Sequence, residues 1–86
     1  MLVQLAELAL EGGDPRMALL RYEQALGHDD GNADAWTGKG VALQQLEHYR
    51  EALVAYDRAL AIDPEHALAR KWRTTCLRHL ESEGTE

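Results

Sequence analysis

Three residues in the C-terminal quarter of the chain have side chains that could carry out chemistry: His66, Cys76 and His79. Cys76 and His79 lie three positions apart, and on a helix this spacing places a thiol and an imidazole on one face. Together they could bind a metal such as Zn²⁺, or act as a nucleophile and its base. No second cysteine completes a metal site, and a helix at the end of a fold offers no pocket for a nucleophile. Cysteine is also a common buried apolar residue, so we expect no metal, no cofactor and no enzymatic activity.

The glycines do not indicate phosphate chemistry either. Gly12-Gly13 falls in an expected turn and Gly38-Lys39-Gly40 in an expected helix, whereas a phosphate-binding glycine loop precedes a helix and cradles its ligand with backbone N–H groups. The remaining class of function is the binding of a partner at the protein surface.

The amino-acid composition limits the possible fold and the possible cellular location. The chain has 86 residues, of which 45% are hydrophobic, with one cysteine, two prolines and no phenylalanine. These numbers favour one helical domain without disulfides. No apolar run approaches the roughly 20 residues that span a bilayer, so we expect a cytoplasmic protein with no membrane partner.

Charge is unevenly distributed along the chain. The formal net charge is −6, yet residues 67–80 contain four basic residues and no acid. A basic segment can contact nucleic acid. We expect instead a solvated helix face whose cations pair with neighbouring carboxylates, and therefore no nucleic-acid partner.

The chain repeats itself at a distance of 34 residues. Arg16, Ala18, Leu19, Tyr22, Ala25, Leu26, Asp29, Ala33 and Ala35 recur as Arg50, Ala52, Leu53, Tyr56, Ala59, Leu60, Asp63, Ala67 and Ala69. Repetition at this period indicates a helix–turn–helix unit that must stack on a copy of itself to bury its apolar face.

Helical spacing of apolar residues and the breakers between them place the elements. We expect helices over residues 1–11, about 15–27, 33–46, 49–62 and 65–80, and a flexible polar tail over 82–86. Asp14 can cap the second helix and Pro15 can occupy its first turn. Asp63-Pro64 ends the fourth, because the residue before proline avoids helical geometry.

Seven residues of the second unit carry a known pattern. They are Trp36, Gly40, Leu43, Ala52, Tyr56, Ala59 and Pro64. In type and spacing they resemble the tetratricopeptide repeat. The resemblance implies an all-α fold in which antiparallel helix hairpins stack as a short right-handed α-solenoid. Gly40 and Ala52 would be small where helices cross, and Tyr56 would fill the space between repeats.

The two ends follow the pattern less closely. Leu2 and Ala6 stand where tryptophan and glycine are usual in the first unit, although Tyr22 matches. Arg70 and Thr74 replace the same two residues in the fifth helix, which resembles a closing cap. We expect one domain over 1–82, with repeats at about 1–32 and 33–66 and a cap at about 67–81. The first unit is some two residues short, which favours a chain cut from a longer array or a minimal natural protein.

The resemblance also implies a binding surface. In such proteins the first helices of successive repeats line a concave groove that holds an extended peptide or a helix. The residues expected to face this groove are Glu7, Leu10, Glu11, Asp34, Thr37, Val41, Gln44, Gln45, Lys71, Thr75 and Arg78. We expect a protein-interaction module with a protein or peptide partner.

One subclass of the family binds the carboxylate tails of heat-shock chaperones through lysine and asparagine. The corresponding positions here hold Val3, Glu7, Gly38, Leu68 and Trp72, so we expect no such clamp. Leu68 and Trp72 lie four positions apart on a helix whose outer face should be polar. They could pack back onto the fourth helix, or form an apolar patch for a partner or a second copy. The alternative function is accordingly self-association, as a homodimer, or a spacer role within a larger assembly.

Overall fold

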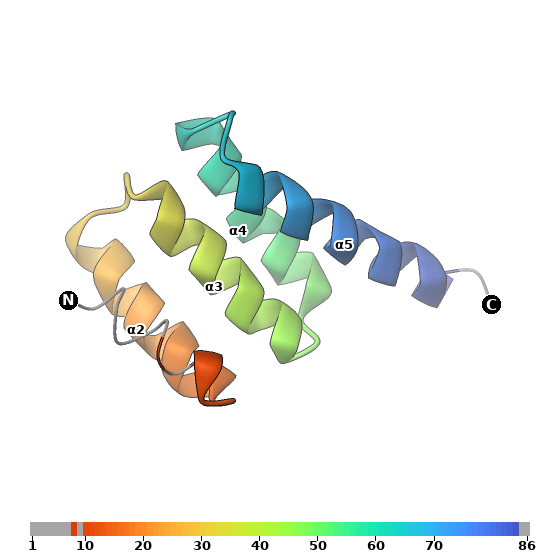
Figure 1. Ribbon diagram of the computed structural model, residues 1–86, viewed down its shortest axis with the longest axis horizontal. Coiled ribbons are helices and arrows are strands. Elements are labelled where there is room, and N and C mark those ends of the chain that lie inside the picture. Colours follow the sequence, from red (N-terminus) through yellow and green to blue (C-terminus); the bar gives the residue numbers. More distant parts are fainter. Residues whose placement is uncertain (1–7, 9, 85–86) are drawn as a thin grey trace.

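The structure, a computed structural model, describes residue 8 and residues 10–84. Four helices follow one another over the described chain: α2 (Pro15–His28), α3 (Ala33–Gln45), α4 (Tyr49–Ile62) and α5 (Ala67–Gly84). No strand occurs among these residues. The chain reverses direction at each short loop, so that α2, α3 and α4 lie side by side and α5 crosses next to them (Figure 1). The expected all-α fold of helix hairpins is confirmed.

Capping side chains fix where α2 and α3 begin. The Asp14 carboxylate accepts a hydrogen bond from the Met17 backbone N–H at 3.1 Å, and Pro15 occupies the first turn, as predicted. Asn32 acts in the same way for α3, accepting from the Ala35 N–H at 3.2 Å. Each bond satisfies a backbone donor that the first turn of a helix leaves without a partner.

The expected helix over residues 1–11 falls mostly outside the described residues. Leu8, Leu10 and Glu11 are helical, and the chain then turns at Gly12-Gly13. Gly13 has a φ of 79°, a left-handed conformation that glycine adopts at little cost.

Helix α5 differs from its prediction at both ends. It begins at Ala67 rather than at residue 65 and continues to Gly84, past the expected end at 80–81 and into the expected tail. The start is set by His66, whose Nδ1 accepts a hydrogen bond from the Ala69 N–H at 3.1 Å. The end extends because the residues after Leu80 contain no strong helix breaker before Gly84, a usual C-terminal residue.

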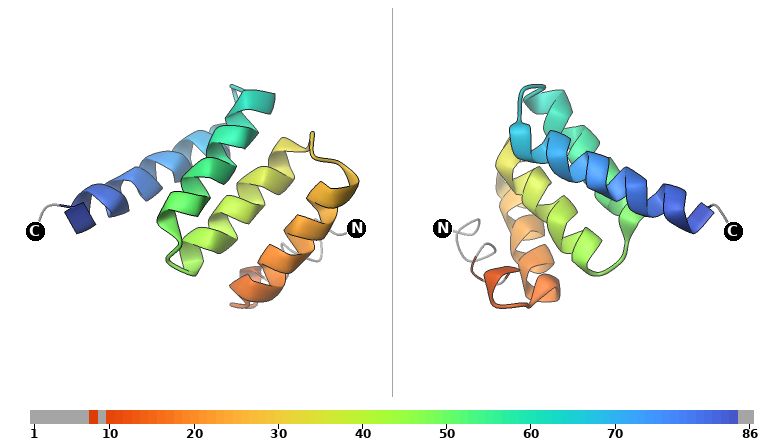
Figure 2. Two further views of the ribbon diagram at one scale, coloured as in Figure 1. Left: turned by 180° about the vertical axis from the view of Figure 1, so that it is seen from behind. Right: turned by 45° about the vertical axis from the view of Figure 1, so that its right-hand side comes forward.

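The core consists of two clusters related by the 34-residue repeat. Ala18 and Tyr22 of α2 pack against Ala35 and Ala42 of α3 in the first cluster. The second cluster joins α3, α4 and α5 and contains Leu43, Ala52, Tyr56 and Cys76. Helix α3 therefore contributes to both, and it is the central element between α2 and the α4–α5 pair (Figure 2).

Two glycines allow close packing of α3 against buried tyrosines. A Cβ added to Gly38 would lie 2.1 Å from Cζ of Tyr22, and one added to Gly40 would lie 2.4 Å from Cε1 of Tyr56. Carbon atoms normally pack 3.5–4.0 Å apart. The role expected for Gly40 is therefore confirmed, and Gly38 has the same role toward the preceding hairpin.

Candidate peptide-binding groove

A groove runs between α3 and α5 and consists of two adjoining hollows of about 350 and 180 Å³. Val41 of α3 and Trp72 of α5 line both hollows, so the groove is continuous. We call it the α3–α5 groove. Its lining residues are Leu10, Tyr22, Asp34, Thr37, Gly38, Val41, Gln44, Gln45, Tyr49, His66, Leu68, Trp72 and His79.

The larger hollow is apolar with one polar end. Leu10, Val41 and Leu68 supply aliphatic surface, and Leu68 remains 55% exposed. Thr37 lies at the base, and its hydroxyl donates to the Ala33 carbonyl at 2.9 Å, so it offers mainly a methyl group. Burial of apolar side chains of a ligand is what such a surface favours.

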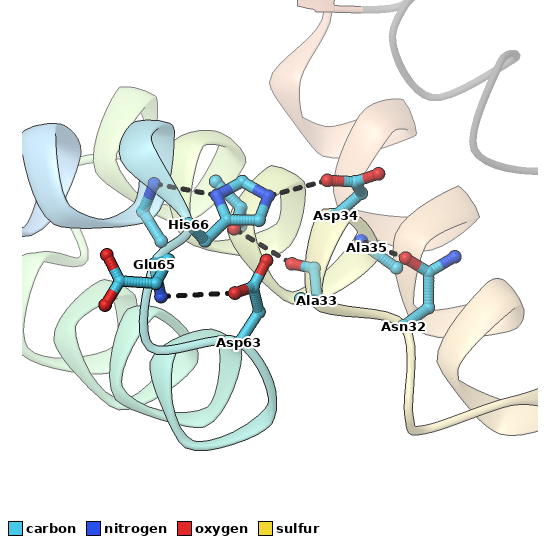
Figure 3. Close-up of polar contacts among 9 residues, drawn as sticks. Asn32, Ala33, Asp34, Ala35, Asp63, Glu65 and His66 are labelled. Atoms are coloured by element: carbon cyan, nitrogen blue, oxygen red, sulfur yellow. Dashed lines mark hydrogen bonds and ion pairs between the residues drawn. The ribbon is translucent and has the colours of Figure 1, made fainter.

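The polar end of the larger hollow is formed by Asp34 and His66. His66 Nε2 lies 2.6 Å from Asp34 Oδ1, and the ring bridges the first turn of α3 and the start of α5 (Figure 3). Position 66 is 34 residues after Asn32, and both side chains cap the helix that follows them. The repeat thus keeps the cap while replacing an amide with an imidazole, which ties the two groove helices together.

The smaller hollow has amide and aromatic walls. Gln44 accepts a hydrogen bond from the buried Tyr56 hydroxyl at 2.8 Å, which fixes the orientation of its side chain. Tyr49 and His79 stack with ring centroids 4.8 Å apart and an interplanar angle of 10°. Gln45 is exposed at the edge. This end can hydrogen-bond a peptide backbone through its amides.

All five groove positions expected on α3 line the groove, whereas those expected on α5 do not. Asp34, Thr37, Val41, Gln44 and Gln45 all line the two hollows, and Leu10 joins them from the N-terminal side. The expected positions Lys71, Thr75 and Arg78 line neither hollow, and Glu11 is exposed away from both. Glu7 lies outside the described residues.

Helix α5 instead presents Leu68 and Trp72, for which the sequence leaves open packing onto the fourth helix or an apolar patch for a partner or a second copy. Leu68 and Trp72 both line the groove, and Trp72 also packs against the second core cluster. Within residues 67–82 of α5, Ala69 and Cys76 are fully buried, and positions 68, 72 and 79 line the groove. Their spacing of four and seven residues is a helical stripe, which is the signal that could have identified them.

The residues that first suggested chemistry are held in other contacts. The Cys76 thiol is buried and donates to the Tyr49 carbonyl at 3.0 Å, and burial raises the pKa of this thiol above its ordinary value. Within residue 8 and residues 10–84, no three side chains of histidine, cysteine, aspartate or glutamate gather as a metal site would require. A thiol that stays protonated and covered is a poor nucleophile.

The basic residues of α5 divide between ion pairs and the groove margin. Arg73 Nε lies 2.7 Å from Asp57 Oδ1 and Arg70 lies 3.8 Å from Glu65. Lys71 lies over the Trp72 ring at 5.8 Å. Of the four basic residues in 67–80, Arg70 and Arg73 therefore form the expected pairs with carboxylates.

A further pair of hollows lies around Trp36, one between α3 and α4 and the other at the C-terminal ends of α2 and α4. Its indole N–H donates to the Asp30 carbonyl at 2.7 Å. Lys39 and Arg58 lie over its ring at 5.3 and 5.6 Å. Because the Trp36 ring already contacts Asp30, Lys39 and Arg58, the α3–α5 groove is the better candidate site. No helix within the described part of the chain is both long enough and apolar enough to cross a bilayer.

Comparisons with known proteins agree with this architecture. A curated relative, the PEX5-related protein of Rattus norvegicus, is 35% identical over 60 residues, which are 70% of this chain and 10% of that protein. The solved structure "First TPR of Spaghetti (RPAP3) bound to HSP90 peptide SRMEEVD" superposes with a TM-score of 0.89 at 19% identity, over 93% of this chain and 64% of that one. This chain thus spans a tenth of the curated relative and just under two thirds of the solved chain. Residues 33–66 match the family model of the tetratricopeptide repeat. Residues 33–66 are therefore similar to a tetratricopeptide repeat, and the chain has the fold of the solved tetratricopeptide-repeat structure.

Proposed function

We propose that the chain is a protein-interaction module that binds an extended peptide or a helix in the α3–α5 groove. The observation that carries this proposal is the continuity of the groove through Val41 and Trp72, with an apolar centre and polar ends. We also propose a non-catalytic role, which the tetratricopeptide-repeat fold supports and in which the groove's Asp34 and His66 serve to join α3 and α5 through their hydrogen bond. We further infer a cytoplasmic location, which the presence of a single cysteine supports, because a chain without internal disulfides fits a reducing compartment.

The proposed partner is a protein segment rather than nucleic acid, a membrane or the acidic tail of a heat-shock chaperone. The solved neighbour holds an HSP90 peptide, SRMEEVD, which is rich in acids. Of the positions where a cationic clamp is expected, the described ones hold Gly38, Leu68 and Trp72. Asp34 is the one carboxylate that lines the described groove, and it would repel such a tail.

The test uses peptides selected on the wild-type protein from a displayed random heptapeptide library. Changing Val41→Glu together with Gln45→Ala should abolish their binding in fluorescence polarisation while far-UV circular dichroism stays unchanged, because a carboxylate would enter the apolar centre. Val54→Glu is the matched control, since Val54 is 62% exposed on α4 outside the groove. Equal loss with the control, or retained binding in the double variant, would contradict the proposal.

A second candidate function is self-association through Leu68 and Trp72. Leu68 is 55% exposed beside the partly buried Trp72, and burying such surface favours association. Because both residues line the groove, a homodimer formed through them would cover the peptide site. The two functions would then exclude each other on one molecule.

A further inference from the structure

We propose that the α3–α5 groove selects an extended peptide in which a lysine or arginine lies about three residues from a bulky apolar side chain, in either chain direction. This rests on the proposed function and names the chemistry of its ligand. The basic side chain would pair with Asp34, and the apolar one would occupy the space between Val41 and Trp72.

The hydrogen bonds of His66 leave a negative charge at the polar end of the groove. Its Nδ1 accepts the Ala69 N–H, so this nitrogen carries no proton. The ring hydrogen is therefore on Nε2 and points to Asp34 Oδ1 at 2.6 Å (Figure 3). A neutral imidazole that donates to a carboxylate orients it without cancelling its charge. The Asp34–His66 pair thus keeps a full negative charge.

This charge is accessible to a ligand. The Asp34 side chain is 76% exposed, whereas the His66 side chain is 12% exposed. No lysine or arginine in the described part of the chain forms an ion pair with Asp34. One carboxylate oxygen is engaged with His66 and the second can accept a hydrogen bond from a ligand ammonium or guanidinium.

The spacing along α3 sets the spacing in the ligand. Val41 is seven residues after Asp34, which corresponds to about 10 Å along a helix that rises 1.5 Å per residue. An extended peptide advances about 3.3 Å per residue, so about three residues bridge the two contacts. Val41 and Trp72 line both hollows, which makes this the place where one large apolar side chain is covered from both helices.

The basic residues of α5 leave the charge of Asp34 in place, because Arg70 and Arg73 are paired with Glu65 and Asp57, and neither Lys71 nor Arg78 lines the groove. The net charge of −6 attracts a cationic segment over distances of about one Debye length. Asp34, the one carboxylate that lines the described groove, disfavours an acidic peptide. The inferred partner is therefore a basic and apolar segment of a protein.

The experiment compares peptides selected from the displayed heptapeptide library on the wild type and on Asp34→Lys. Wild-type binders should be enriched in lysine or arginine about three positions from a large apolar residue, and Asp34→Lys should lose this enrichment. Asp30→Lys is the matched control, because Asp30 is exposed and lines a hollow outside the groove. Its binders should keep the basic residue.

A double-mutant cycle measures the contact itself. Asp34→Asn preserves an acceptor for His66 and should weaken a selected peptide about two- to fivefold, as expected for an exposed ion pair. Replacing the basic residue of the peptide with glutamine should have the same effect, and the two changes together should cost no more than either alone. Additive losses, or wild-type binders without basic residues, would overturn the inference. If the selected peptides contradict this inference but still lose affinity for the Val41→Glu, Gln45→Ala variant, the groove binds peptides and the proposed function stands. If they bind that variant as well as the wild type, the proposed function fails too.

Discussion

Replacing Gly40 with alanine tests the close packing that brings α3 and α4 together. The added Cβ would lie 2.4 Å from Cε1 and 2.7 Å from Cδ1 of Tyr56, so the ring would have to move by about 1 Å to reach normal contact distances. Tyr56 is fully buried and its hydroxyl is bonded to Gln44 at 2.8 Å, which leaves little room to move. Overpacking of this kind costs about 1–3 kcal/mol.

Alanine also favours the helix by about 1 kcal/mol relative to glycine. The net loss for Gly40→Ala should therefore be at most about 2 kcal/mol, or at most roughly 16 °C in the melting temperature of a domain of this size, and the loss relative to a glycine-to-alanine change without a clash should be about 1–3 kcal/mol. Thermal unfolding followed by circular dichroism at 222 nm measures it. Gly27→Ala is the control, because nothing lies within 4 Å of the added Cβ, and it should be neutral or stabilising. A Gly40→Ala protein as stable as Gly27→Ala would refute the packing argument.

Two further predictions concern alkaline stability and association. Burial raises the pKa of Tyr56, with a smaller contribution from nearby Cys76, and burial also raises the pKa of Cys76. The folded state then holds both protons more tightly than the unfolded state, so stability should be complete below about pH 8 and fall above about pH 9. Urea unfolding from pH 7 to 10.5 would show this fall, Cys76→Ala should delay its onset, and a flat profile would contradict it. For self-association, the wild type should sediment as a dimer at about 100 µM if the constant is micromolar, with Trp72→Glu remaining a folded monomer; a monomeric wild type would exclude this role.

The sequence predicts α2, α3 and α4 well because local residues mark their ends. Asp14 and Pro15 begin α2, and Asp63 precedes a proline at the end of α4. Helix α5 was predicted less well because its cap is His66. An imidazole is seldom recognisable as a cap from sequence, and this one becomes clear only beside its repeat equivalent, Asn32.

Some residues of the groove can be predicted from local sequence patterns, whereas others depend on contacts between helices. Positions on α3 follow from helical spacing and the family pattern, so Asp34, Val41 and Gln44 were anticipated. Tyr22 enters the groove from α2 and Tyr49 from the start of α4. Such contacts depend on how helices cross, which the spacing of residues within one helix does not reveal. The rotation of α5 depends on the same crossing, and it determines that Trp72, rather than Lys71, lines the groove.

The central position of α3 has a consequence for how the molecule opens. Among the described helices, α2 contacts α3 alone, whereas α3 contacts α2, α4 and α5. Among the described helices, α2 would detach by losing one interface and α5 by losing two, against three for α3, so local opening within this part of the chain should involve α2 or α5 before α3. When α5 detaches, α3 stays packed and its side of the groove is preserved, whereas the side formed by α5 is lost until the helix packs again. A ligand that contacts both walls would bind the closed form alone, and its binding energy would reduce the fluctuations of the C-terminal helix.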